Sequence, residues 1–352
     1  MSVHEATLQS LFGRMFEELS ANYGGVMISI GHRLGLYRLM AEAGPLGCEA
    51  IAERSGCATR YIQEWLASQV AGGCVAYDPE GGTCRLTPEQ AAIFADPSSS
   101  TYLAPAWQCV AALWAGEERT LEAFRTGRGV AWGEQDKRMI CGSAAFYRNG
   151  YAASLVQDWL PALSGVVERL EEGCHVADIG CGHGHSTLLM AEAFPDSRFI
   201  GIDADLGSIA VARQLVEERG LAERVSFVAR DARELPAQSY DLICFFDCLH
   251  DMGFPVETAL AARRALRLGG SVLLVEPYAR DRLEDNVGAV ARTFYAASTA
   301  VCCAHAISEA GSHVLGAQAG FSALRGVLEE AGFGSVSIAL ETPFNLVIEA
   351  RA

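Results

Sequence analysis

The sequence predicts an α/β protein with a doubly wound sheet, in which all strands but the last run parallel, preceded by a smaller, mainly helical domain. Short apolar segments alternate with helical patterns after Pro161, which is typical of a sheet covered on both faces. The last two apolar segments are separated only by Glu341-Thr-Pro-Phe344, so the final strand is predicted to be antiparallel to its neighbour. A glycine-rich loop follows the first apolar segment.

The N-terminal part, residues 1–100, has the pattern of a winged helix. Residues Ile30, Leu34, Leu36, Tyr37 and Leu39 mark one helix, a short helix is predicted at 49–55, and a third helix is predicted at 58–71. The segments 74–77 and 83–86, joined by Asp78-Pro-Glu-Gly-Gly82, are predicted to form a β-hairpin.

A winged helix can bind DNA, but the charges here favour a dimerisation or substrate-capping role. The third helix carries one base, Arg60, against one acid, Glu64, and the hairpin sets Asp78 and Glu80 against Arg85. The whole chain has 43 acidic and 27 basic residues, a net charge of -16. Nucleic acids and anionic membranes attract basic surfaces, so neither is expected as a partner.

Residues 101–165 are predicted to form a helical, aromatic-rich linker and cap. Tyr147 and Tyr151 lie one helical turn apart just before the next domain. They could close over a ligand, or they could be part of an aromatic stripe in the core.

Residues 166–352 carry the alternating pattern. Strands are predicted at 175–179, 198–202, 225–228, 241–246, 271–275, 336–340 and 345–348. Helices are predicted at 186–194, 206–219, 255–267 and 321–331.

The loop after the first strand suits a ligand that approaches the backbone closely. Gly180, Gly182 and Gly184 leave room for such a ligand, and Asp178 precedes them by two residues. The spacing differs from the dinucleotide pattern G-x-G-x-x-G, and a carboxylate at this position favours a cationic ligand over a diphosphate.

Further acids follow the next two strands. Asp203 lies 23 residues after Gly180, where a carboxylate can accept hydrogen bonds from ribose hydroxyls. Asp231 could accept from an adenine amino group, and Ala232 could donate its backbone N–H. Because ligands of such sheets bind at the carboxyl ends of the strands, these residues are expected in one crevice.

With these motifs the chain resembles the class I S-adenosylmethionine-dependent methyltransferases, which have a Rossmann-like sheet. It is most similar to the small-molecule O-methyltransferases that carry an N-terminal winged-helix dimerisation domain. The matching pieces are D-x-G-x-G-x-G at 178–184, Asp203, Asp231-Ala232, Leu249-His-Asp251 and Leu268-Gly-Gly270. The resemblance implies S-adenosyl-L-methionine as cofactor, a backbone carbonyl of Phe246 for its amine, and a homodimer.

The resemblance also implies a catalytic base, His250, oriented by Glu276. Two departures stand against a phenol-type mechanism: residues 314–320 hold no second carboxylate, and Met252 stands where the family often has Trp. His250 could instead only shape the pocket.

An insertion at 278–320 is predicted to be helical, with Val287, Val290, Phe294 and Val301 on one face. It could be a lid over an apolar substrate or a dimer interface. Substrate contacts are expected from Tyr147, Tyr151, Asp251, Phe294 and Tyr295.

The remaining signals concern the compartment and metals. The twelve cysteines form no C-x-x-C pair, and the N-terminus has no signal-peptide pattern, so a reduced, cytoplasmic protein without a metal site is expected. Cys302-Cys303 could bind a soft metal, but two cysteines on an alanine-rich helix is the favoured interpretation.

The sequence thus predicts a methyltransferase for a hydrophobic or aromatic small molecule, acting on oxygen rather than nitrogen, carbon or sulfur. Two alternatives remain open. One is a winged-helix transcriptional regulator that binds the cofactor without turnover. The other is an enzyme that uses the sulfonium only for its charge.

Overall fold

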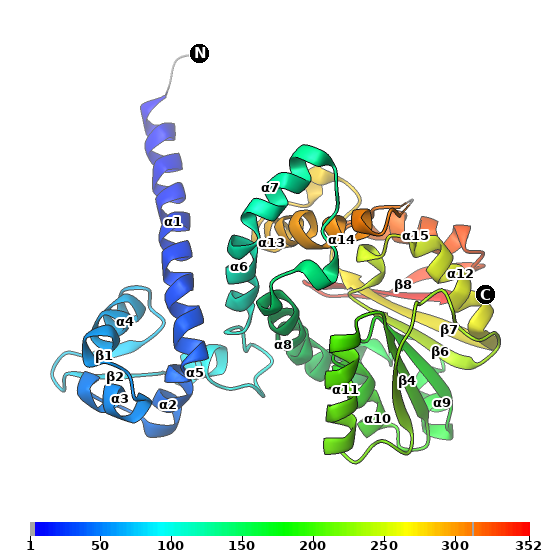
Figure 1. Cartoon of the computed structure of the whole chain (residues 1–352), viewed down its shortest axis with the longest axis horizontal. Coiled ribbons are helices and arrows are strands. Elements are labelled where there is room, and N and C mark those ends of the chain that lie inside the picture. The colour runs from blue at the N-terminus through cyan, green and yellow to red at the C-terminus, as the bar shows by residue number, and fades with distance from the viewer. Residues whose placement is uncertain (1–3, 312) are drawn as a thin grey trace. The chain divides into compact units, whose positions relative to one another are not determined.

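The computed structural model describes residues 4–311 and 313–352 of the chain (Figure 1). It divides into two compact units. The first comprises the chain up to Ala115 together with Asp136–Asn149, and the second comprises Gly116–Gln135 and Gly150–Ala352. The domain limits at residues 100 and 165 that the sequence indicates stay a prediction. In the described residues, no helix has the length and apolar character needed to cross a membrane.

The first unit contains the predicted winged helix. A small core that includes Tyr37, Ile51 and Trp65 joins its helices to the hairpin β1–β2. The hydroxyl of Tyr37 donates to the buried Oε1 of Gln69 at 2.5 Å, which satisfies both polar groups. The elements are α1 (Glu5–Arg33), α2 (Leu36–Ala43), α3 (Cys48–Ser55), α4 (Thr59–Ala71), β1 (Ala76–Asp78), β2 (Thr83–Arg85), α5 (Pro88–Phe94), α6 (Ala106–Ala115) and α8 (Lys137–Ser154). The last five residues of α8, 150–154, belong to the second unit.

The prediction of one helix through residues 30–39 was wrong. Helix α1 ends at Arg33 and α2 begins at Leu36, because Gly35 between them adopts φ +70°, a conformation that other residues rarely adopt. The sequence analysis also missed the extension of α1 back to Glu5. Its apolar residues are exposed, so this part of the helix buries almost nothing within the chain.

The second unit contains the predicted seven-stranded sheet, in the order β5-β4-β3-β6-β7-β9-β8. Strands β3 to β7 pair in parallel, and β9 pairs antiparallel with both β7 and β8, which confirms the predicted hairpin. The strands are β3 (His175–Ile179), β4 (Arg198–Asp203), β5 (Val225–Ala229), β6 (Tyr240–Phe246), β7 (Leu266–Pro277), β8 (Ser335–Glu341) and β9 (Asn345–Arg351).

Two apolar cores sandwich this sheet. Leu170, Leu188 and Ile209 belong to the core on one face, and Ala262 and Leu324 belong to the core on the other. The first core therefore draws on α9 (Val166–Glu172), α10 (His185–Ala193) and α11 (Leu206–Glu218), and the second on α12 (Pro255–Ala265) and α15 (Gly320–Glu330). This arrangement leaves the carboxyl ends of the parallel strands for loops, where ligands of such sheets bind.

The insertion is helical as predicted, but it does not present one continuous face. Helix α13 (Ala289–Ala297) continues into the π-helical turn η5 (Ser298–Cys302) and then into α14 (Cys303–Ser308). A π turn adds a residue to the helical register, so side chains before and after it point in different directions. Val301, within the π turn, is buried, whereas Val287 precedes α13 and is 79% exposed.

Candidate active site

The glycine-rich loop between β3 and α10 is shaped by three left-handed glycines. Gly180, Gly182 and Gly184 have φ of +70°, +52° and +77°. A Cβ at Gly180 would lie 2.7 Å from the Cys248 Sγ, so this glycine allows the loop to pack on the segment after β6. A Cβ at Gly182 would meet no atom within 4 Å, so the loop leaves open space on that side.

Asp178, at the carboxyl end of β3, is buried and holds the start of α10. Its Oδ2 accepts hydrogen bonds of 2.6 Å from the hydroxyls of both Ser186 and Thr187. Its Oδ1 is also buried and has no hydrogen-bond partner among the described residues. Burial raises the pKa of Asp178 to about 6, although the two hydroxyls partly offset that shift.

Asp203, at the end of β4, braces the glycine loop. Its Oδ2 accepts from the backbone N–H of Gly182 at 2.8 Å, and its Oδ1 accepts from that of Asp205, also at 2.8 Å. Burial raises the pKa of this carboxyl, against the effect of those two bonds. The predicted cofactor-binding residues of β3 and β4 therefore lie in one connected structure.

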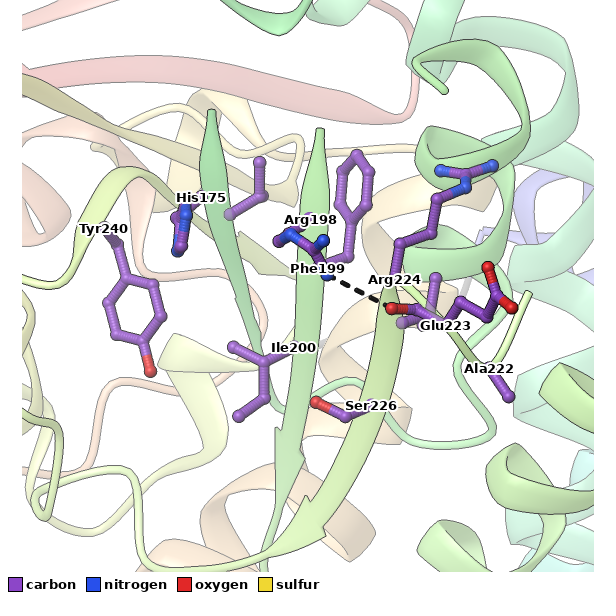
Figure 2. A pocket seen from close by; sticks show the side chains of 11 residues that line it. His175, Arg198, Phe199, Ile200, Ala222, Glu223, Arg224, Ser226 and Tyr240 are labelled. Carbon is purple, nitrogen blue, oxygen red and sulfur yellow. Dashed lines mark hydrogen bonds between the residues drawn. The ribbon is translucent and has the colours of Figure 1, made fainter. Parts of the chain in front are cut away.

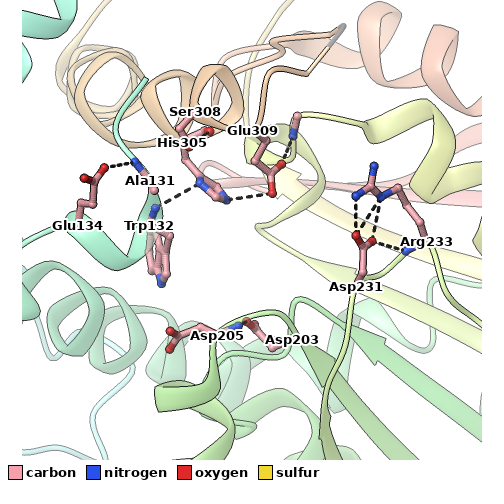
Figure 3. Close-up of polar contacts among 11 residues, drawn as sticks. Ala131, Trp132, Glu134, Asp203, Asp205, Asp231, Arg233, His305, Ser308 and Glu309 are labelled. Atoms are coloured by element: carbon pink, nitrogen blue, oxygen red, sulfur yellow. Dashed lines mark hydrogen bonds and ion pairs between the residues drawn. The ribbon is translucent and has the colours of Figure 1, made fainter. Parts of the chain in front are cut away.

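The predicted residues after β5 and β6 are arranged differently. Asp231 forms an ion pair with Arg233 (Figure 3), which lowers the pKa of Asp231. The Arg233 guanidinium lies 4.5 Å from the centre of the Phe254 ring. Ala232 is partly buried beside this pair. The Phe246 ring, at the end of β6, is packed into the core against Trp159.

His250 and Glu276 form a buried pair, the arrangement that the resemblance implies for a base and its orienting carboxylate. The turn η3 (Leu249–Asp251) brings the Nδ1 of His250 against the Oε2 of Glu276, near the end of β7. Glu276 Oε1 also accepts from the backbone N–H of Leu249 at 2.9 Å, so the carboxylate fixes both the turn and the ring. The two side chains are 4% and 1% exposed, respectively.

A thiol that the sequence analysis did not assign to the site, Cys302 of η5, lies within hydrogen-bonding reach of the His250 ring. Burial alone would lower the pKa of His250, but the Glu276 carboxylate and Cys302 raise it well above 6.5. No spacing rule connects residue 302 with residue 250. The packing of η5 on η3 brings the two residues together.

Two more acids surround this pair. Burial raises the pKa of Asp247 to about 8 and that of Asp251 to about 6. The Tyr151 hydroxyl donates to Asp247 Oδ2 at 3.1 Å, which places this predicted substrate residue beside the acid cluster. Asp247 itself was missed, and its backbone φ of +52° marks it as unusual for a non-glycine residue.

The other predicted substrate residues are not brought to this cluster by any contact that the structure describes. Tyr147 belongs to the first compact unit, where its ring contacts Phe146 edge to face. Phe294 and Tyr295 lie half-buried on α13, which continues into η5. Their roles toward a substrate stay predictions.

The carboxylates of the site suit a ligand that carries a positive charge. The unpartnered Oδ1 of Asp178 and the raised pKa of both Asp178 and Asp203 describe desolvated acids that a nearby positive charge would stabilise. The open side of Gly182 supplies space beside the loop that Asp203 braces.

A separate cavity of about 280 Å³ lies at the opposite edge of the sheet (Figure 2). It is lined by His175, Arg198, Val225 and Tyr240, the first residues of β3, β4, β5 and β6, among others. Its two arginines at Arg198 and Arg224 donate to the backbone carbonyls of Glu223 and Phe194. None of the predicted site residues lines it.

Comparison with known proteins gives the class of this fold. Residues 170–332 match the family model of a methyltransferase domain, and residues 23–96 match that of an Rv2258c-like winged HTH domain. The chain therefore combines a region similar to methyltransferase domains with an N-terminal region similar to winged HTH domains.

Solved structures extend the likeness over the whole chain. The mitomycin 7-O-methyltransferase MmcR is 19% identical, with a TM-score of 0.73 over 99% of this chain and 100% of that one. Human N-acetylserotonin methyltransferase, solved with S-adenosylmethionine, is 16% identical, with a TM-score of 0.73 over 97% of both chains. At these identities the likeness describes the fold.

Curated relatives match over shorter stretches. The trans-aconitate 2-methyltransferase of Streptomyces avermitilis is 39% identical over 82 residues, which are 23% of this chain and 30% of that protein. Methyltransferase GfsG of Streptomyces halstedii is 32% identical over 142 residues, 39% of this chain and 51% of that protein. The chain thus spans between about a third and a half of the length of these two relatives.

Proposed function

We propose that this protein is an S-adenosylmethionine-dependent methyltransferase that acts on a hydroxyl group of a hydrophobic or aromatic small molecule. The observation that carries the proposal is the buried His250–Glu276 pair beside a glycine loop braced by Asp203. A loop of this form supports cofactor binding, and an imidazole held by a carboxylate supports removal of a proton from an acceptor. The methyltransferase names of the relatives and structural neighbours support the same activity.

The residues divide the task between binding and proton transfer. Asp203 would hold the ribose, Asp178 Oδ1 and the Phe246 carbonyl the amine, and Gly180, Gly182 and Gly184 the amino-acid portion. Asp231 and Ala232 would hold the adenine, and the Asp231 carboxylate would contact both the adenine and Arg233. When bound, S-adenosylmethionine supplies a methyl group activated by a positively charged sulfur.

On the acceptor side, His250 would take the hydroxyl proton on Nε2, because Nδ1 faces Glu276. Glu276 would stabilise the imidazolium that forms. Tyr151 and Asp251 would line the acceptor site with Phe294 and Tyr295, and the buried surroundings would exclude water from the transfer.

The activity is tested with methyl-labelled S-adenosylmethionine and a panel of hydroxylated aromatic compounds. We expect labelled product and S-adenosylhomocysteine in equal amounts for at least one compound, and neither without an acceptor. Conversion of an acceptor into a product that carries no label would instead favour an enzyme that uses only the charge of the sulfonium. Binding of S-adenosylhomocysteine with no product across aromatic, aliphatic, amine and thiol acceptors would contradict the proposal.

The pH dependence of turnover tests the role of Glu276. A base must be neutral to accept a proton, so turnover should rise with pH through the pKa of His250. The Glu276 carboxylate is a main cause of the raised pKa, with Cys302, Asp247 and Asp251 nearby. In Glu276→Gln the pKa of His250 should fall, so the acid-side midpoint of kcat should move to lower pH even though kcat itself decreases. An unmoved midpoint would mean that Glu276 does not set this titration.

We further propose that the protein is a homodimer that pairs through α1. A stripe of exposed apolar residues runs along this helix at alternating spacings of about three and four residues, the pattern of a helix that packs on another helix. It comprises Leu8, Leu11, Phe12, Met15, Phe16, Leu19, Tyr23, Val26 and Ile30. An apolar face of this length is unusual on a solvent-exposed protein surface. The same face on α1 of a second copy of the chain could pack against it.

Charge substitutions in this stripe should split the dimer. Phe12→Glu with Phe16→Glu places two carboxylates on side chains that are 65% and 62% exposed in the single chain, so the fold of each chain should survive. Sedimentation velocity should show a dimer for the unmodified chain and a monomer for the double variant. Tyr61→Glu, on an exposed residue of α4, is the matched control and should remain dimeric. A monomeric unmodified chain would contradict this proposal.

The cytoplasm is the compartment that we propose, because all twelve cysteines lie in the described part of the chain and are free thiols. No group of three or more His, Cys, Asp and Glu side chains in that part is arranged to hold a metal ion. Nothing specific favours the regulator alternative. Arg60, the base on the third helix of the winged domain, is paired with Glu64.

A further inference from the structure

A connecting segment outside all the predicted site residues reaches the same edge of the sheet. Residues 128–135, here called the strap, follow α7 (Glu117–Thr126) and include the turn η1 (Trp132–Glu134). The strap belongs to the second compact unit. It packs along η5 and α14 of the insertion.

Main-chain hydrogen bonds fix the strap in this position. The Val130 N–H donates to the Ala304 carbonyl at 2.8 Å, and the Trp132 N–H donates to His305 Nδ1 at 3.3 Å. Gly129 allows the close approach, because a Cβ there would lie 2.0 Å from the Ser308 nitrogen. The strap is therefore an ordered part of the catalytic unit, held by specific contacts along its length.

Helix α14 in turn is tied to the loop that carries the candidate base. Glu309, directly after α14, accepts from the Gly253 N–H at 2.7 Å, and its other carboxylate oxygen lies 3.9 Å from His305 Nε2. Gly253 lies two residues after Asp251, the last residue of η3. The strap, α14 and the loop after β6 are thus connected into one layer at the carboxyl ends of the parallel strands.

The Trp132 side chain projects from this layer. Its ring is tilted against His305, with 6.5 Å between the ring centroids, and it is only partly buried. Figure 3 shows the indole pointing away from the strap, toward the loop after β4 that carries Asp203 and Asp205. A large aromatic ring therefore points toward the loop that carries Asp203, and it is not part of either apolar core.

We propose that Trp132 is a cofactor-binding residue that covers the adenosine portion of the ligand opposite Asp203. This inference rests on the proposed function, because it takes the ligand to be S-adenosylmethionine or its demethylated product. A flat indole can stack on a purine whatever its polar edges do, and such stacking contributes substantially to binding. The strap then links cofactor binding to the insertion that also carries Cys302.

Calorimetric titration with S-adenosylhomocysteine tests the proposal without needing an acceptor. In Trp132→Ala the Kd should rise between about 5-fold and 150-fold, the range that loss of one aromatic–base stack produces. Trp132→Phe keeps a ring and should recover most of the affinity. Trp114→Ala, a substitution of an exposed tryptophan in the first compact unit, should leave the Kd unchanged.

Two further measurements locate the effect. Adenosine alone should lose affinity in Trp132→Ala by a similar factor, whereas homocysteine alone should not. The change in tryptophan fluorescence on addition of S-adenosylhomocysteine should be large for the unmodified chain and mostly absent in Trp132→Phe.

The outcomes distinguish the proposed function of the protein from the proposed role of Trp132. No binding of S-adenosylhomocysteine by the unmodified chain would overturn the proposed function itself. Binding by the unmodified chain with the same Kd in a folded Trp132→Ala, judged by its circular dichroism, would overturn only the role of Trp132.

Discussion

Replacing His250 by alanine should lower kcat by about 10²- to 10⁴-fold, the range that a positioned general base contributes, while the Kd for S-adenosylhomocysteine stays within about twofold. The expected split follows from the geometry. The His250 ring contacts Glu276 and Cys302, whereas the glycine loop is braced separately by Asp203. Single-turnover kinetics with an acceptor from the panel would measure the first effect and calorimetry the second.

The control for this variant is His175→Ala. His175 is an exposed histidine at the start of β3, at the opposite edge of the sheet, so its loss should change neither quantity. Because removing His250 leaves the Glu276 carboxylate buried without its main partner, His250→Gln should be measured as well. If either His250 variant folds and retains full turnover, His250 only shapes the pocket.

Replacing Asp203 by alanine should raise the Kd for S-adenosylhomocysteine by at least about 100-fold. Two hydrogen bonds from ribose hydroxyls to a carboxylate contribute about 3 kcal/mol or more together, and each 1.4 kcal/mol is a tenfold change. The same change frees the N–H groups of Gly182 and Asp205, which the carboxylate now holds at 2.8 Å each. The loop would therefore lose order before the ligand arrives, which adds to the loss.

Asp203→Asn separates these contributions, because an amide keeps one acceptor oxygen and the size of the side chain. Its Kd should lie between those of the unmodified chain and Asp203→Ala. Asp241→Asn, at the amino-terminal end of β6, is the matched control for a change of charge elsewhere on the sheet. An unaltered Kd in a folded Asp203→Ala would remove this residue from the cofactor site.

The sheet could be predicted from the sequence because its strands are short, apolar and separated by helices. All seven were predicted to within a few residues, apart from β7, which begins at Leu266, five residues before the predicted start. The winged helix was predicted for the same reason, since its helices bury apolar faces within their own unit. The extension of α1 back to Glu5 was missed although its apolar residues recur at helical spacing, and Gly35 ends the helical path where the apolar pattern continues.

The candidate site could be predicted only where residues follow strands directly. The positions of Asp178, Asp203, Asp231 and His250 follow from the rule that carboxyl ends of parallel strands meet at one edge. Cys302 and Trp132 could not be placed this way, because η5 and the strap come from elsewhere in the chain and reach the site through tertiary packing. The unpaired Oδ1 of Asp178 and the Asp231–Arg233 ion pair likewise depend on side-chain positions that spacing does not determine.

The central claim is that a ribose-bearing sulfonium cofactor binds at the carboxyl edge of this sheet against Asp203. Calorimetric titration of the full chain with S-adenosylhomocysteine, beside the same titration of Asp203→Ala, tests it most directly. We expect one site per chain in the unmodified protein and no measurable saturation at the same concentrations in the variant. An absence of binding heat in the unmodified protein at several temperatures, or an equal Kd for both proteins, would contradict the account.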